Sequence, residues 1–285
     1  MKLKFGVRVH DMAHNTNIEY LASILNKINI KYMQLVFPKA LENCSYDEKN
    51  VLNIAKVLRK EKLKIAMLGA YFNPVHSSKE VVEKGINNFK ENLRISKELG
   101  NPYVGSETGS YNDSPWTYVP KNHTEEGYNE TLGVFKELVK YAEEVDAKIS
   151  VEPAWNHVIY DVDTLKRFVG DLNSSHVHVT IDLFNLLYEG NFDSRDKIFE
   201  HALKTFGEQI KIIHLKDALI KEGKMVQVAP GEGDFHYPLM IHLIKRYCPN
   251  AVLVFEGVKP EKIESSYSYL LKIEEKYCNV SIIRL

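Results

Sequence analysis

The 285-residue sequence predicts an α/β protein and, within that class, a single closed (β/α)₈ barrel. Three observations favour this fold. Short β-branched or aromatic runs alternate with long amphipathic segments, eight such pairs can be counted, and the chain is somewhat longer than the roughly 250 residues typical of such a barrel. A doubly wound open sheet is the alternative, but the first turn, RVHDMAHN, lacks the Gly-rich phosphate-binding loop of a dinucleotide-binding unit.

The predicted strands are the short runs rich in β-branched and aromatic residues. They cover residues 3–10, 32–37, 64–72, 103–109, 148–155, 177–185, 210–217 and 251–258. Apolar residues at helical spacing predict helices over residues 18–28, 48–63, 81–99, 125–145, 162–172, 195–206, 239–247 and 262–276. No Pro/Gly/Ser-rich linker divides the chain, and a barrel cannot close without all eight units. We therefore predict one domain, residues 1–285.

Two of the predicted connections are unusually long. Residues 110–128, after the fourth strand, carry Trp116, and long loops at this end of a barrel often form lids or substrate walls. The alternative is a surface loop with no role. Residues 218–237, after the seventh strand, end in a turn with Gly231 and Gly233, which would either bring backbone amides near the barrel mouth or serve only as a turn.

Composition restricts the class of partner. Lys and Arg total 37 against 38 Asp and Glu, so no positive excess suggests a nucleic-acid or acidic-membrane partner. No apolar run approaches the roughly 18 residues of a membrane span, and the N-terminus lacks a signal-peptide core. Three scattered cysteines, Cys44, Cys248 and Cys278, favour free thiols in a reducing compartment. We expect a cytoplasmic protein, as a monomer or a homo-oligomer, that acts on a small molecule.

Four polar residues stand at the ends of consecutive predicted strands: Glu152, Asp182, His214 and Glu256. In a (β/α)₈ barrel the chemistry lies at the C-terminal ends of the strands, where inward side chains converge. Each residue alone could cap a helix, be solvated or be a hydrogen-bonded core residue. Together, at matching depth on neighbouring strands, they predict a site.

A divalent metal ion would explain this cluster. Three carboxylates facing one another without a cation would repel, whereas a metal lets all three stay ionised. Three oxygen ligands and one imidazole suit Mn²⁺ or Mg²⁺ and allow Co²⁺ or Zn²⁺. An ion that prefers five or six ligands would keep positions open for the adjacent oxygens of a hydroxy-ketone or aldehyde.

The order Glu, Asp, His, Glu, with VEP, IDLFN, HLKD and PGEGDF around it, resembles the xylose isomerase-like TIM-barrel superfamily of sugar isomerases and epimerases. The resemblance spans essentially the whole chain. It implies that Glu152, Asp182, His214 and Glu256 hold one metal ion, and that Glu152 and Glu256 double as acid and base. Proton transfer through a metal-stabilised enediolate would then isomerise or epimerise a sugar or sugar derivative.

The sequence departs from the ketohexose 3-epimerases of this superfamily. Where they have an Asn-Arg-x-Glu run, a His and an Arg, this chain has Trp155, Asn156 and Val158, then Asn185, then Ile220. The HLKD motif resembles the inosose dehydratase and hydroxypyruvate isomerase branches more closely. A lyase on the same metal site is therefore one alternative, and a non-catalytic sugar-binding barrel is another.

The superfamily also contains apurinic endonuclease IV, a trinuclear zinc enzyme that needs several further histidines. This chain has LGAYF on the third strand, Glu107 on the fourth and Asn185 after the sixth, where that enzyme has histidines. Together with the balanced charge, these departures argue against a nucleic-acid substrate.

Five further side chains are candidates for contacting the substrate: Trp116, Trp155, His157, Lys216 and Glu107. Lys216 follows His214 by two residues, so strand alternation points both toward the pocket. Its alternative is an ion pair with Asp217 or Glu232. Trp155 and His157 could instead pack the loop, and Glu107 could orient a metal ligand.

Overall fold

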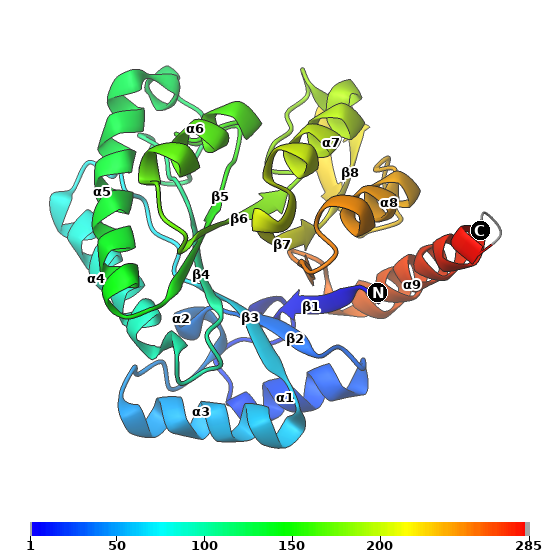
Figure 1. Ribbon diagram of the computed structural model, residues 1–285, viewed down its shortest axis with the longest axis horizontal. Coiled ribbons are helices and arrows are strands. Elements are labelled where there is room, and N and C mark those ends of the chain that lie inside the picture. Colours follow the sequence, from blue (N-terminus) through cyan, green and yellow to red (C-terminus); the bar gives the residue numbers. More distant parts are fainter. Residues whose placement is uncertain (1, 283–285) are drawn as a thin grey trace.

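The computed structural model describes residues 2–282, with side chains described as far as residue 276. Eight parallel strands form a closed barrel in the order β1-β10-β7-β6-β5-β4-β3-β2, and helices surround it (Figure 1). The strands are β1 (Lys4–Arg8), β2 (Tyr32–Leu35), β3 (Lys64–Gly69), β4 (Tyr103–Glu107), β5 (Lys148–Glu152), β6 (Val177–Asp182), β7 (Ile210–Leu215) and β10 (Val252–Phe255). The predicted single (β/α)₈ barrel is confirmed, and each predicted strand contains one of these strands.

The helices lie on the outside of the barrel, between successive strands. They are α1 (Ile18–Lys27), α3 (Glu48–Glu61), α4 (Lys79–Ser96), α5 (Glu125–Glu144), α6 (Val162–Leu172), α7 (Arg195–Phe206), α8 (Tyr237–Tyr247) and α9 (Pro260–Ile282), with a single turn, α2 (Phe37–Ala40), after β2. Side-chain caps fix several starts: Asn17, Asp47, Thr124 and Asp161 each accept a hydrogen bond from the backbone N–H three residues on. All eight predicted helix starts lie within two residues of the observed ones, and the four capped starts match their predicted residues.

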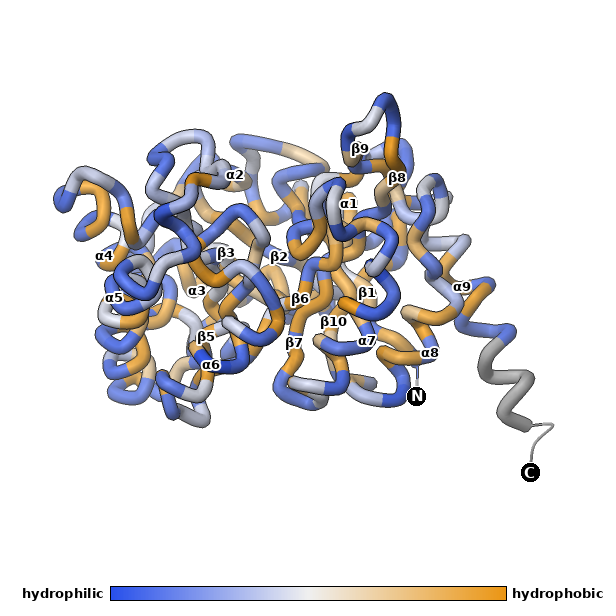
Figure 2. The backbone as a smooth tube through the Cα atoms, turned by 90° about the horizontal axis from the view of Figure 1, so that it is seen from above, coloured by the Kyte–Doolittle hydropathy of each residue, from blue (hydrophilic) through white to orange (hydrophobic). Residues whose placement is uncertain are grey.

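The connection after β7 is an antiparallel hairpin, which the sequence analysis treated as an open loop. Strands β8 (Asp217–Lys221) and β9 (Lys224–Val228) pair across Glu222 and Gly223. Both turn residues have positive φ, 53° and 75°, as a two-residue hairpin turn of the primed type requires. The hairpin projects from the top of the molecule in Figure 2, on the side opposite the N-terminus.

Asp217 holds the Gly-rich turn that follows this hairpin. Its carboxylate accepts hydrogen bonds from the backbone N–H groups of Gly231 (2.9 Å) and Phe235 (3.0 Å). A Cβ at Gly233 would lie 2.4 Å from the same carboxylate, so only glycine fits there without rearrangement. Asp217 is therefore occupied by backbone donors.

The hydrophobic core has two parts. The larger part lies between the outer face of the strands and the helices, and the smaller fills the barrel interior with Ala66, Met67, Ile212, Val252 and Val254. Figure 2 shows the strands as the hydrophobic centre of the chain.

Within residues 2–282, no helix combines the length and the apolar character that crossing a bilayer would take. Cys44 and Cys248 are free thiols, while the side chain of Cys278 lies outside the described residues.

We predict that Phe135→Ala destabilises the barrel strongly. Phe135 is fully buried on α5 and packs against Phe168, with ring centroids 5.3 Å apart. Truncating such a ring leaves a cavity and should lower the free energy of unfolding by about 3–5 kcal/mol. Urea denaturation measures this loss, with the half-exposed Tyr20→Ala as the aromatic control. A loss no larger than that of the control would contradict the packing described.

Candidate metal centre

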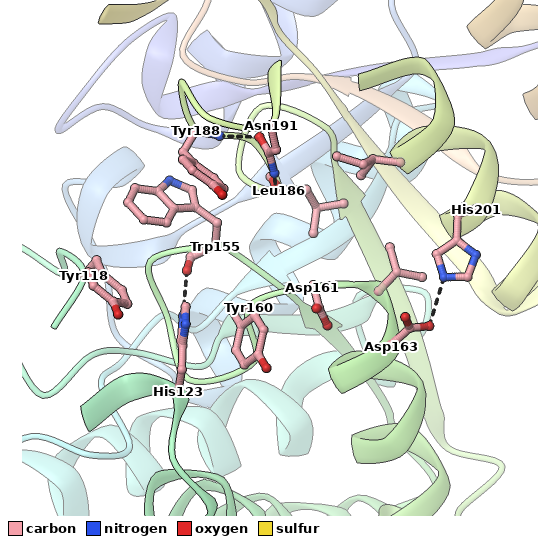
Figure 3. A pocket seen from close by; sticks show the side chains of 12 residues that line it. Tyr118, His123, Trp155, Tyr160, Asp161, Asp163, Leu186, Tyr188, Asn191 and His201 are labelled. Carbon is pink, nitrogen blue, oxygen red and sulfur yellow. Dashed lines mark hydrogen bonds and ion pairs between the residues drawn. The ribbon is translucent and has the colours of Figure 1, made fainter. Parts of the chain in front are cut away.

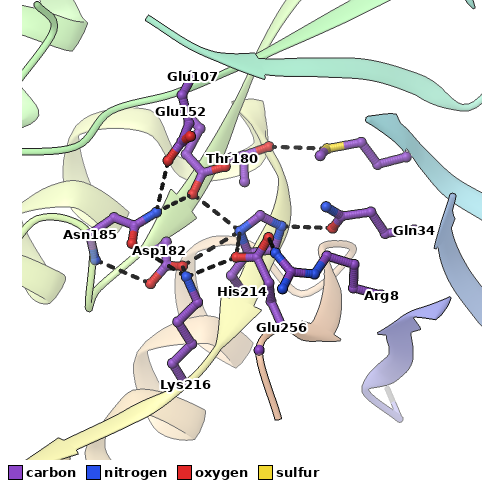
Figure 4. Close-up of polar contacts among 12 residues, drawn as sticks. Arg8, Gln34, Glu107, Glu152, Thr180, Asp182, Asn185, His214, Lys216 and Glu256 are labelled. Atoms are coloured by element: carbon purple, nitrogen blue, oxygen red, sulfur yellow. Dashed lines mark hydrogen bonds and ion pairs between the residues drawn. The ribbon is translucent and has the colours of Figure 1, made fainter. Parts of the chain in front are cut away.

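Four side chains converge at the C-terminal end of the barrel. Glu152 ends β5, Asp182 ends β6, His214 is the penultimate residue of β7, and Glu256 follows β10. One donor atom from each lies within 4.8 Å of the others, and all four residues are buried (Figure 4). The structure thus brings together the four residues that the sequence analysis selected as metal ligands.

The imidazole of His214 lies at the middle of this group. Its Nδ1 is 3.2 Å from Glu152 Oε1 and 3.0 Å from Glu256 Oε2. Its Nε2 lies 2.8 Å from the amide oxygen of Gln34, which can only accept a hydrogen bond. Nε2 therefore carries a proton, and Nδ1 is the nitrogen that faces the carboxylates.

Two permanent cations contact the same carboxylates. Lys216 Nζ lies 2.6 Å from Asp182 Oδ2 and 2.9 Å from Glu256 Oε2. Arg8 Nη1, from β1, lies 2.6 Å from Glu256 Oε1, while the rest of its guanidinium binds Asp11. The predicted alternative for Lys216, an ion pair with Asp217 or Glu232, is not among the contacts of the described residues.

Burial and neighbouring charge shift the pKa values of these groups in different directions. Burial raises the pKa of Glu152, although the charge of His214 opposes it. Burial acts on Glu256 as well, but the positive charges of His214 and Lys216 outweigh it and hold its pKa well below the usual range. Burial, with the charges of Glu152 and Glu256, raises the pKa of Glu107 to about 8. Burial lowers the pKa of His214, but the carboxylates of Glu256 and Glu152 raise it well above the ordinary value.

The donor set fits a divalent metal ion. Three buried carboxylates and the Nδ1 of His214 point to one place, and oxygen donors with one nitrogen suit Mn²⁺ or Mg²⁺ and allow Co²⁺ or Zn²⁺. A metal would replace the proton on Nδ1, because imidazole binds metals in its deprotonated form. Gln34 holds the ring in the orientation that this requires.

A cavity of about 600 Å³ opens beside this group. Of the candidates for contacting a substrate, it is lined by Glu107, Trp116, His157 and Lys216, together with Arg8, His10, Tyr71 and Asn185. The ring of Trp116, from the long connection after β4, lies edge-on to His157 with centroids 5.6 Å apart. The long connection therefore forms one wall of the cavity.

Trp155 lies in a second cavity, of about 630 Å³, beside the first (Figure 3). Its ring lies against those of Tyr118 and Tyr188, with centroids 5.7 and 5.0 Å away. Its backbone N–H donates to the carbonyl of Asn185, whose side chain in turn donates to Glu152 Oε1 at 2.8 Å. Trp155 thus reaches the metal centre through its backbone and not through its ring.

Sequence reasoning missed Arg8 and Gln34. Gln34 could have been noticed because it is a polar residue inside the apolar run YMQLVF. Arg8 follows Gly6 by two residues on the first strand, so both side chains point to the same side of the sheet. Their partners, Glu256 and His214, are 248 and 180 residues away in the sequence. Only the closure of the barrel brings these pairs into contact.

The comparisons with known proteins agree with this geometry. The sequence pattern of a protein family described as xylose isomerase-like TIM barrel matches residues 22–273. No curated protein matches the chain in sequence.

Three solved structures illustrate the fold. An L-ribulose 3-epimerase is 12% identical with a TM-score of 0.73, and 98% of each chain is covered. A xylose isomerase-like TIM barrel protein from Mycobacterium smegmatis, in complex with magnesium, is 11% identical with a TM-score of 0.73, covering 95% of this chain and 96% of that one. An IOLI protein with a bound zinc atom is 19% identical with a TM-score of 0.74, covering 97% of this chain and 99% of that one. At these identities the likeness shows the fold alone.

We predict that His214→Ala lowers the metal content of the purified protein. The change removes the only nitrogen of the four-residue group and leaves its carboxylates without the imidazole between them. Elemental analysis after dialysis against Mn²⁺ or Mg²⁺ measures the effect. His201→Ala is the matched control because His201 is half-exposed on α7, and it should bind metal like the wild type. Equal metal content in both variants would exclude His214 as a ligand.

Proposed function

Because the chain belongs to the xylose isomerase-like TIM-barrel family, we propose that it is a divalent-metal-dependent isomerase or epimerase of a small sugar or sugar derivative. The observation that carries this proposal is the convergence of Glu152, Asp182, His214 and Glu256 within 4.8 Å at the C-terminal end of the barrel. The structural relatives include an L-ribulose 3-epimerase and a D-psicose 3-epimerase solved in the presence of D-fructose, which supports a carbohydrate substrate.

The cavity beside the metal centre suits a small polyhydroxylated molecule. Its volume of about 600 Å³ is in the range of small-molecule sites, and charged and amide groups line it. Lys216, Asn185 and Glu107 give it a polar wall, and Trp116 gives one apolar wall. We assign Lys216, Glu107, Trp116 and His157 to substrate binding. Trp155 acts, in this proposal, by fixing the loop that carries it.

Glu152 and Glu256 transfer the proton. Removing a proton from a carbon next to a carbonyl is difficult because negative charge develops on the oxygen, and a bound divalent ion would stabilise that charge. One glutamate takes the proton from carbon and the other returns one. Both carboxylates approach the same imidazole nitrogen, at 3.2 and 3.0 Å, and Glu256 also lines the cavity.

Lys216 gives a specific reason to keep a dehydratase as the second candidate. Its ammonium is buried, lines the cavity and lies 2.6 Å from Asp182. An ammonium in this place can donate a proton to a departing hydroxyl group, which would turn proton abstraction into loss of water. The two reactions differ in the mass of the product.

We predict that Glu152→Gln lowers turnover by at least about 100-fold while the protein still binds some metal, because an amide cannot transfer the proton. The measurement screens ketoses, inososes and hydroxypyruvate with Mn²⁺ in deuterated water and follows the product mass. Deuterium in a product of otherwise unchanged mass indicates isomerisation or epimerisation, and loss of water indicates dehydration.

Glu144→Gln is the matched control for this variant, since Glu144 is exposed at the end of α5. It should behave like the wild type. Full activity in Glu152→Gln would exclude the acid/base role of Glu152. No turnover of any substrate by the wild type would instead favour a sugar-binding barrel without catalysis.

A further inference from the structure

The N-terminal end of the barrel, opposite the metal centre, carries a ring of lysines. Lys4, Lys64 and Lys148 are the first residues of β1, β3 and β5, and Lys211 is the second residue of β7. Three of these lysines, Lys4, Lys64 and Lys211, line one cavity. In Figure 2 the chain enters β1 at the bottom, while the β8–β9 hairpin, beyond the end of β7, lies at the top.

A cavity of about 660 Å³ opens at this end. Its basic lining residues are Lys4, Arg59, Lys62, Lys64, Lys97 and Lys211. Among the described residues that line it, Glu98 is the only acid. The whole chain has a net charge of −1, so this positive charge is a local feature and not a general property of the surface.

The cations of this cavity have little compensation within the chain. Lys4 Nζ donates to the carbonyl of Asn250 at 3.1 Å, which is a neutral partner. Among the ion pairs of residues 2–276, none includes Lys62, Lys64 or Lys211. An anion in this cavity would therefore meet ammonium groups that no carboxylate of the described residues already binds.

Uncharged groups beside the lysines also lack partners. His178, on β6, lies edge-on to Tyr103 with centroids 5.0 Å apart, and its Nδ1 has no hydrogen-bond partner among the described residues. Burial, and then the charges of Lys211 and Lys148, lowers the pKa of His178 to about 4. The buried side-chain oxygen of Asn101, which lines the cavity, has no partner there either, and as an acceptor it suits a hydroxyl group of a ligand and not a phosphate oxygen.

We propose that this cavity is a binding site for a small phosphorylated molecule, whose phosphate oxygens accept hydrogen bonds from Lys4, Lys64 and Lys211. A phosphate offers about two negative charges and three acceptor oxygens, which suits lysines that approach from several strands. Tyr32 and Tyr103 line the same cavity and provide ring faces for the remainder of the molecule. The site shares no residue with the metal centre, so it does not depend on the proposed reaction.

The test is calorimetric titration of the full chain with pyrophosphate, without added metal because pyrophosphate chelates divalent ions. Lys64→Gln/Lys211→Gln should bind at least about 10-fold more weakly than the wild type, since two charge-assisted contacts are lost. Lys56→Gln/Lys60→Gln removes the same charge from exposed positions on α3 outside the cavity and should bind like the wild type. Glu152→Gln, at the other end of the barrel, should also bind pyrophosphate normally.

A second readout separates loss of binding from loss of folding. Without ligand, Lys64→Gln/Lys211→Gln should melt close to the wild-type temperature, because neither lysine makes an ion pair among the described residues. Absence of pyrophosphate binding to the wild type, or equal weakening in the two double variants, would overturn the site. Citrate binding as tight as that of pyrophosphate would overturn the assignment to phosphate.

Discussion

The close approach of three buried carboxylates to one imidazole is the constraint on which the C-terminal end of the barrel depends. Glu152, Asp182 and Glu256 lie around His214 with little access to water, where like charges repel strongly. The chain itself supplies Lys216 and Arg8 as compensation, and part of Arg8 is engaged by Asp11. A divalent ion would contribute further positive charge, with the ammonium of Lys216 lining the cavity beside it.

Strand alternation connects the two ends of the molecule. Strand β5 shows this most simply, with Lys148 at its start and Glu152 at its end on the same face, and apolar residues such as Met67, Ile212 and Val254 fill the barrel interior. This interior keeps the negative and positive ends from neutralising each other. Each end therefore keeps a charge that a ligand of opposite sign can meet.

Sequence reasoning found the features that depend on one strand at a time. A polar residue directly after an apolar run marks the end of a barrel strand, which is why Glu152 and Asp182 could be selected without a structure. Contacts between distant strands, such as that of Gln34 with His214, could not be predicted, because they form only when the barrel closes. The direction of side chains in loops could not be predicted from sequence spacing either. Trp155 and His157 are two residues apart, yet they line different cavities. The β8–β9 hairpin was overlooked although the turn residues Glu222–Gly223 lie between alternating runs.

The central claim is that the Glu152, Asp182, His214 and Glu256 side chains together hold one divalent metal ion. Crystals grown with Mn²⁺ and measured at the manganese absorption edge test it most directly. We expect one strong anomalous peak within coordination distance of all four side chains. An anomalous map without a peak there would contradict it.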